Sequence, residues 1–131
     1  MDPVVHFEMP YEDKQRAADF YRQAFGWKAQ LLGPEMGEYV VVQTDETDEK
    51  GMLSKTNRIN GGLYKKSDDP ATHVPSVVIA VNDIDEARKK IELAGGRVLG
   101  EPMEIPGIGL YVGFTDTEGN RVGMLKPSQD M

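Results

Sequence analysis

The sequence repeats itself once, and this duplication limits the folds that it can adopt. Three identical pairs mark an offset of 70 residues: Asp13 and Asp83, Ala17 and Ala87, Gly26 and Gly96. Farther along the chain the spacing between matching residues of the two copies changes. This implies about eleven residues late in the first copy that the second copy lacks. A copy of roughly sixty residues buries little surface by itself, so we expect the two copies to pack together as a single domain over residues 1–131.

The composition is that of an ordinary globular protein and excludes several kinds of function. The chain has no cysteine and a net charge of −7, without a cluster of Lys and Arg. Nucleic acid and membrane are therefore not expected as partners, and disulfides and thiolate chemistry are excluded. The N-terminal stretch lacks the basic region and long apolar run of a secretory signal, so we expect cytoplasmic residence.

Each copy opens with a strand and a helix. Alternating hydrophobic residues predict strands over 4–9 and 76–81. Apolar residues at helical spacing predict helices that follow them and cover a sheet. The stripe of the first helix, over 13–26, consists of Ala17, Phe20, Tyr21, Ala24 and Phe25. The stripe of the second consists of Ile84, Ala87, Ile91 and Ala94.

The ends of these helices have typical capping residues. Asp13 and Asp83 are placed to accept hydrogen bonds from the first turn of each helix. Gly26 and the pair Gly95 and Gly96 are placed to end them, because glycine readily adopts the left-handed conformation.

Three strand candidates follow each helix, so each copy is expected to be a βαβββ module in an α+β fold. The candidates are 27–32, 38–44 and 59–65 in the first copy, and 97–104, 109–115 and 121–126 in the second. The module boundaries predicted from this order are 1–66 and 76–131, joined by a linker at 67–75. The polar segment 45–58, which contains DETDEK, is expected to be a solvated loop.

Two motifs give the chain a resemblance to a known family. The pattern D-x3-A-x2-FY-x3-FGW begins at Asp13, and PMEIPGIGLYVGFTDTEGNRVGMLKP covers 102–127. Both are similar to stretches of the vicinal oxygen chelate superfamily, which includes glyoxalase I, bleomycin-resistance proteins and extradiol dioxygenases. The resemblance implies cupped mixed sheets paired edge to edge around a cavity between the modules, helices outside, and a homodimer.

The same resemblance indicates where metal ligands would lie. In metal-dependent members, one ligand comes from the first strand and one from the last strand of each module. The matching positions here are His6, Gly62, Ser76 and Gly123, so one of four ligands is retained. We therefore expect no metal or other cofactor, and no metal-dependent glyoxalase I activity. A divalent metal stays an alternative because Glu8 shares the strand face of His6.

The lost carboxylates suggest a largely uncharged pocket wall. The residues expected to line it are His6, Glu8, Gly62, Tyr64, Ser76, Gly123 and Leu125. Glycines in strands also mark places of close approach, so the two glycines have a structural alternative. Tyr39 and Tyr111 occupy equivalent positions and could line the pocket or pack under a helix. Trp27 is expected to pack between helix and sheet, and His73 to be a solvated linker residue.

Three functions are compatible with these features. The first is a glyoxalase/bleomycin-resistance-like protein that binds a small, moderately apolar organic molecule without metal. The second is a lyase, isomerase or dioxygenase-type enzyme that acts on a small oxygenated metabolite, with His6 or Glu8 as general base. The third is an interaction module whose cavity has no ligand.

Overall fold

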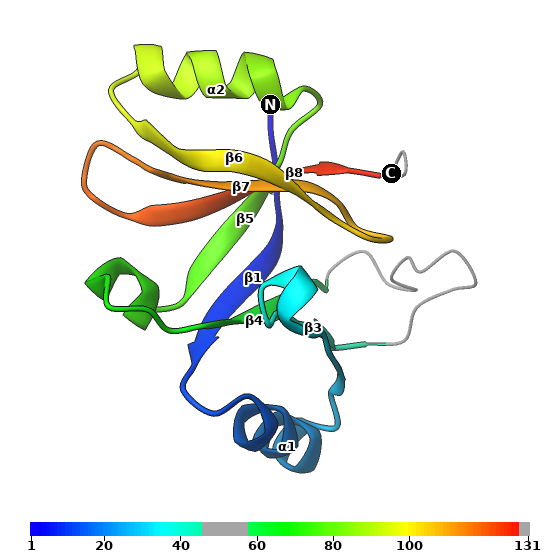
Figure 1. The fold of residues 1–131 in the computed structure, drawn as a ribbon. Coiled ribbons are helices and arrows are strands. Elements are labelled where there is room, and N and C mark those ends of the chain that lie inside the picture. The colour runs from blue at the N-terminus through cyan, green and yellow to red at the C-terminus, as the bar shows by residue number, and fades with distance from the viewer. Residues whose placement is uncertain (46–57, 129–131) are drawn as a thin grey trace. The chain divides into compact units, whose positions relative to one another are not determined.

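The structure is a computed structural model that describes residues 1–45 and 58–128. Its contacts divide the chain into two compact units. We call His6–Pro75 the first module, and Met1–Val5 with Ser76–Met131 the second module. The element order is β-α-β-β-β twice, which confirms the predicted α+β fold with two βαβββ modules (Figure 1). The predicted loop at 45–58 lies almost wholly outside the described residues.

The first module has a four-stranded mixed sheet in the order β2-β3-β4-β1. Neighbouring β1 and β4 are parallel, and the other neighbours are antiparallel. Its elements are β1 (Val4–Tyr11, whose first two residues belong to the second module), α1 (Lys14–Phe25), β2 (Lys28–Leu31), η1 (Pro34–Met36), β3 (Val40–Gln43), β4 (Asn60–Lys65) and η2 (Pro70–His73). The predicted linker therefore contains a short 3-10 helix, and His73 at its end is exposed, as expected.

The caps of α1 form as predicted. The Asp13 carboxylate accepts a hydrogen bond from the Arg16 backbone N–H at 3.0 Å, which satisfies a donor that the first turn leaves without a partner. At the other end Gly26 has a φ of 72°, and its N–H donates to the Arg22 carbonyl. The helix thus begins and ends where the sequence indicates.

The predicted apolar stripe of α1 is only partly correct. Ala18 is fully buried and Ala17 packs against the core, but Phe20 and Phe25 are 57% and 64% exposed. Ala24 is exposed as well. The small alanines let the helix lie close to the sheet, and the larger rings then pack beside it rather than beneath it.

Trp27 packs between helix and sheet, as predicted. Its ring stacks on that of Tyr21 with centroids 4.7 Å apart, and its centroid lies 5.5 Å from that of the tilted Phe7 ring. Of these rings, Phe7 and Trp27 pack against the core of the first module. The buried residues that form the core cluster of that module are Tyr11, Val40, Val42 and Leu63.

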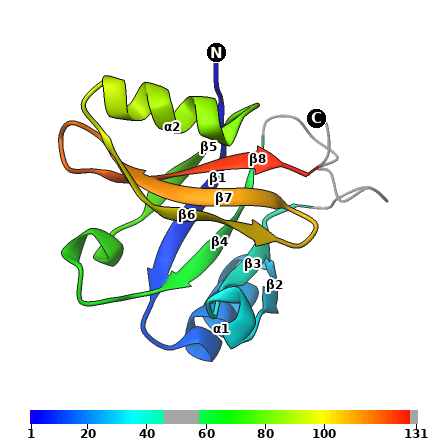
Figure 2. The same cartoon turned by 45° about the horizontal axis from the view of Figure 1, so that its top comes forward.

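The second module repeats this plan with the strand order β5-β8-β7-β6. Figure 2 shows α2 lying along one face of this sheet. The elements are β5 (Ser76–Ala80), α2 (Ile84–Leu93), β6 (Arg97–Ile105), β7 (Gly109–Thr115) and β8 (Arg121–Pro127). The buried core cluster of this module consists of Ile84 at the start of α2 with Val81, Val112 and Met124.

One prediction for α2 is wrong. Ala94 was expected in the apolar stripe, but it is the exposed C-cap residue, because the helix ends at Leu93 before Gly95 with its φ of 99°. The N-terminal cap is correct, since the Glu86 N–H donates to the Asp83 carboxylate at 3.1 Å.

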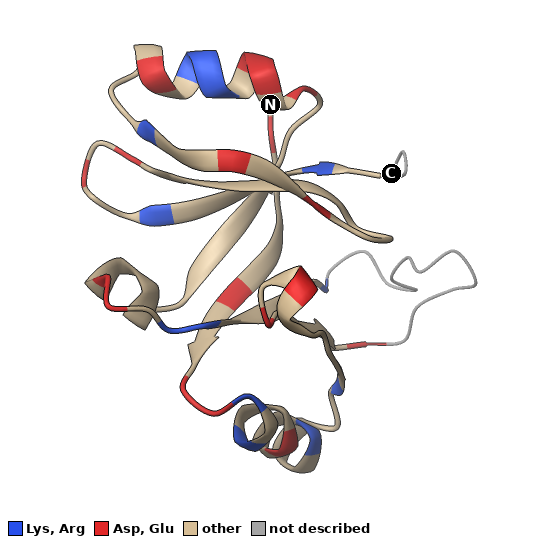
Figure 3. Cartoon of the chain, in the orientation of Figure 1, with Lys and Arg blue, Asp and Glu red and all other residues tan. Residues whose placement is uncertain are grey.

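Charged residues are concentrated on the helices and connecting segments of both modules, whereas most strand residues are uncharged (Figure 3). No helix in the described ranges is both long and apolar enough to cross a membrane.

Candidate half-sites on the non-helix faces

The predicted site residues of the first module lie on the sheet face opposite α1. The core residues Val40 and Leu63 point toward the helix, so residues of the opposite phase point away from it. His6 and Glu8 on β1 have this opposite phase, and the strand register places Glu8 beside Gly62 on β4. We call this surface, with its equivalent opposite α2, the non-helix face of each module.

Glu8 of the first module is a buried polar side chain, with 2% of its surface exposed. The hydroxyl group of Tyr39 donates a hydrogen bond to Glu8 Oε2 at 2.8 Å. A carboxyl group this deeply buried requires such donors, because burial without them would be strongly unfavourable. The pair thus places a carboxyl group and a phenol together on the non-helix face.

Gly62 makes room for the ring of Tyr39. A Cβ atom at position 62 would lie 1.9 Å from Tyr39 Oη and 2.1 Å from Cζ, far inside van der Waals contact. The ring therefore occupies the volume that any side chain at position 62 would need. A carboxylate cannot replace Gly62 while Tyr39 keeps this position.

The second module has the same arrangement at the equivalent positions. A Cβ atom on Gly123 would lie 2.6 Å from Tyr111 Cε2 and 2.8 Å from its Oη. Both tyrosines therefore lie on non-helix faces, and neither packs under a helix. The structural alternative for the two glycines is correct in this sense: each allows close approach of a tyrosine ring.

His6 is half-buried and hydrogen-bonded to its own module. Its Nδ1 lies 3.2 Å from the carbonyl oxygen of Asn60, the residue opposite it on β4. Burial lowers the pKa of the imidazole from 6.5, and the hydrogen bond to Asn60 opposes this only in part. The neutral form is thereby favoured near neutral pH.

The four positions that match the family's ligands do not fit a catalytic divalent metal. They supply one imidazole, one hydroxyl and two glycines, where such a metal needs at least three nitrogen, sulfur or carboxylate ligands. The two glycine positions are filled by tyrosine rings. Within 1–45 and 58–128, no three His, Cys, Asp or Glu side chains come together as a possible metal site.

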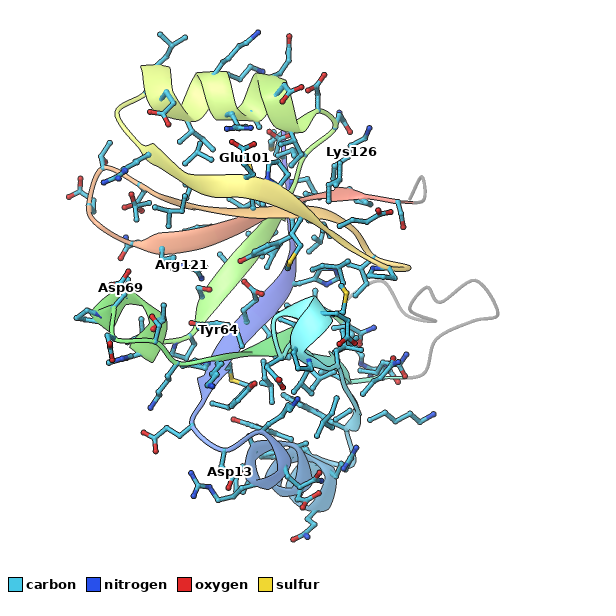
Figure 4. All side chains as sticks on the ribbon, in the orientation of Figure 1. Asp13, Tyr64, Asp69, Glu101, Arg121 and Lys126 are labelled. Carbon is cyan, nitrogen blue, oxygen red and sulfur yellow. The ribbon has the colours of Figure 1, made fainter. Side chains whose placement is uncertain are left out.

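The remaining predicted site residues, Tyr64, Ser76 and Leu125, also have the strand phase of the non-helix faces. Tyr64 follows Gly62 by two residues on β4, and its hydroxyl donates to the Val74 carbonyl at 2.7 Å. In the second module, Leu125 is 2% exposed and Ser76 is half-buried. Figure 4 labels Tyr64 on its sheet.

Sequence reasoning missed the contribution of Arg121. This residue precedes Gly123 by two positions on β8, so strand alternation could have placed it on the non-helix face. Its guanidinium Nη2 lies 3.3 Å from where a Cβ atom of Gly113 would be. Figure 4 shows its side chain on the side of β8 away from α2.

A sequence model described as "Glyoxalase/Bleomycin resistance protein/Dioxygenase superfamily" matches residues 4–124. The anthracycline biosynthesis protein DauV of Streptomyces sp. (strain C5) is 30% identical over 120 residues, which cover 86% of this chain and 42% of DauV. The chain thus spans less than half the length of that relative. A glyoxylase-like domain-containing protein of Didymella fabae is 28% identical over 123 residues, or 89% of this chain and 88% of that protein.

Solved structures share the fold at low sequence identity. A methylmalonyl-CoA epimerase in complex with methylmalonyl-CoA and NH4+ has a TM-score of 0.68 and 18% identity, over 98% of this chain and 96% of that one. The Streptomyces coelicolor methylmalonyl-CoA epimerase variant E43Q, in complex with 2-nitronate-propionyl-CoA, has a TM-score of 0.67 and 17% identity, over 96% and 97%.

Proposed function

Because the chain belongs to the Glyoxalase/Bleomycin resistance protein/Dioxygenase superfamily, we propose that it binds a small, moderately apolar organic molecule on its non-helix faces without the four-ligand metal site. One observation carries this proposal: a tyrosine ring covers the glycine at both last-strand ligand positions. The family's metal positions have thus become aromatic surfaces.

The chemistry of these faces suits a planar, oxygenated ligand. The rings of Tyr39 and Tyr111 offer π surfaces with a hydroxyl group at the edge. The carboxylate of Glu8 and the hydroxyl oxygen of Tyr39 can accept hydrogen bonds from a hydroxyl group of the ligand. Such a combination of apolar wall and few polar groups is typical of small-molecule sites. The name of the relative DauV, an anthracycline biosynthesis protein, makes a polycyclic aromatic molecule a reasonable first probe.

The test is calorimetric titration with 1,4-dihydroxyanthraquinone. We expect saturable binding. The affinity of the first module's face should weaken at least about tenfold in Tyr39→Ala, and that of the second module's face in Tyr111→Ala, because each ring supplies contact area worth about 1.4 kcal/mol or more. The control is Phe25→Ala, which removes an exposed ring on α1 and should leave the affinity unchanged. If neither this probe nor a broad panel of aromatic and amphiphilic molecules binds, the proposal is wrong.

A second candidate function, that of an isomerase, lyase or dioxygenase-type enzyme, is favoured by Glu8 itself. A buried carboxyl group hydrogen-bonded to a phenol is well placed to accept a proton from an acidic carbon atom. This candidate predicts exchange of a substrate C–H proton with deuterated water, monitored by NMR over a panel of 2-oxo acids, hydroxyketones and malonyl thioesters. Exchange should be lost in Glu8→Gln and retained in Glu12→Gln, which removes an exposed carboxylate. Absence of exchange over the whole panel would count against it.

A further inference from the structure

The non-helix face of the second module is basic, although the chain as a whole carries a charge of −7. The strand register pairs Thr115 with Arg121 on one side and with Arg97 on the other. Two arginines and a hydroxyl residue therefore form one row across three strands. Continuing the register of β5 with β8 by two residues places Ser76 at the end of this row, beside Arg121.

The carboxylates of this module lie elsewhere. Three are on α2, namely Asp85, Glu86 and Glu92, and Asp83 caps its N-terminus. Glu101 lies where the register of β6 shifts and pairs with Arg88 of α2 at 3.4 Å. Glu104 has the phase opposite to Met103, and Asp116 and Glu118 lie in the turn after β7. Among the described strand residues with non-helix phase, the second module thus has cations and no carboxylate.

The side chain of Arg121 lies along the sheet surface. Its Nη2, Cζ and Nε atoms are 3.3, 3.6 and 3.8 Å from the position of a Cβ atom on Gly113. Gly113 is paired with Gly123, which lies under the ring of Tyr111. A guanidinium and a phenol thus lie over two opposed glycines, one on each strand of the β7–β8 hairpin.

We infer that this face binds the carboxylate group of an organic acid, with Arg121 as its cation and Tyr111 as the aromatic surface beside it. The inference rests on the proposed function and names its ligand class. A guanidinium matches a carboxylate with two parallel N–H donors. Arg121 has five N–H donors in all, so it can bind a carboxylate while it keeps hydrogen bonds to neighbours.

Ser76 adds a polar group to the same row. Its Oγ is buried and has no hydrogen-bond partner among the described residues. A buried hydroxyl without a partner is unfavourable, and a ligand oxygen near Arg121 would offer one. We therefore expect Ser76→Ala to weaken binding of the acid by less than Arg121→Met does.

The experiment compares anthraquinone-2-carboxylate with anthraquinone-2-carboxamide by calorimetry. These probes share one ring system and differ in the charge that Arg121 is expected to recognise. We expect the wild-type protein to bind the acid about 10- to 100-fold more tightly than the amide, the range of a hydrogen bond to a charged group. Arg121→Met should abolish this preference, and Arg121→Lys should retain part of it, since lysine keeps the charge without the planar fork.

The matched control is Lys126→Met. Lys126 is on the same strand with the opposite phase, and Figure 4 shows Lys126 and Arg121 on opposite sides of β8. Both variants lose one positive charge, so an effect of net charge alone would appear equally in both. Equal loss of preference in the two variants would overturn the inference.

A measurement on the wild-type protein makes the test independent of variant folding. The NMR signal of the Arg121 Nε–H group should shift on addition of the acid and not of the amide. If the amide binds as tightly as the acid and the binding of both depends on Tyr111, the proposed function stands and the carboxylate site is wrong. If neither probe nor the wider panel binds, both are wrong.

Discussion

The hydroxyl group of Tyr39 donates a hydrogen bond to the carboxyl group of Glu8 at 2.8 Å. The ring that holds this hydroxyl lies directly over Gly62, where a single added carbon would collide with it. The buried carboxyl group, the phenol and the glycine therefore form one unit, in which each part depends on the other two.

Removing the hydroxyl in Tyr39→Phe should destabilise the fold by about 1–3 kcal/mol, because buried Glu8 loses a donor. Denaturant unfolding would measure this. The control is Tyr64→Phe. The hydroxyl group of Tyr64 donates to a backbone carbonyl at an exposed place, so its removal should destabilise the fold less. A Tyr39→Phe protein as stable as the wild type would show that this hydrogen bond does not support the buried carboxyl group.

Gly62→Ala should destabilise the protein by about 1–3 kcal/mol, as overpacked positions do. Gly113→Ala is the control, since its nearest neighbour would be the flexible end of Arg121 at 3.3 Å. The cost at position 62 should largely vanish when Tyr39 is also alanine, which gives a coupling free energy of at least about 1 kcal/mol in a double-mutant cycle. Additive effects would contradict the packing described here.

The pKa of His6 predicts part of the pH dependence of stability. Burial lowers this pKa below 6.5 in the folded state, so the unfolded chain takes up the proton first as pH falls. Stability should therefore decrease below pH 6.5, until the folded-state pKa is passed. His6→Gln should reduce this decrease, measured as unfolding free energy at pH 7.5 and pH 5, whereas the exposed His73→Gln should not. The same pH dependence in His6→Gln and wild type would assign the effect to other groups.

Removing divalent metals should leave the protein unchanged. Two of the family's ligand positions are glycines covered by tyrosines, so a chelator has no complete ligand set to strip. We expect equal melting temperatures and equal affinity for 1,4-dihydroxyanthraquinone before and after dialysis against EDTA. Stoichiometric zinc, nickel, manganese or iron that is lost in His6→Ala would contradict this.

The family resemblance also predicts a homodimer. Sedimentation equilibrium should then give twice the monomer mass of 14.5 kDa. Phe20→Ser with Phe25→Ser tests whether the exposed ring pair on α1 takes part, since both rings are more than half exposed in the single chain. A monomer at every concentration tested would refute the dimer.

Local signals in the sequence are sufficient to predict most of the fold. The caps at Asp13 and Asp83 and the glycine at position 26 define helix ends through hydrogen bonds between near neighbours. The rotation of α1 is not predictable in this way, because it depends on how closely Ala18 approaches the sheet. Periodicity alone does not show that the small Ala18 is buried while the larger Phe20 is exposed.

The candidate site is harder to predict than the fold. Strand alternation was enough to place Glu8 and Gly62 on one face, since it depends only on backbone phase. It could not show that the ring of Tyr39 lies over Gly62, because this contact depends on side-chain direction across two strands. The same applies to Arg121 and Gly113, where the glycine leaves space that only the folded sheet reveals.

The fit between each tyrosine and its glycine has a consequence for how such proteins can diverge. A larger residue at position 62 or 123 is tolerated only where the partner ring has been lost, so the two members of a pair should change together. Among relatives, bulk on the last strand should therefore accompany a small residue in place of Tyr39 or Tyr111. Each module can make this exchange separately, because each contains its own ring and its own glycine.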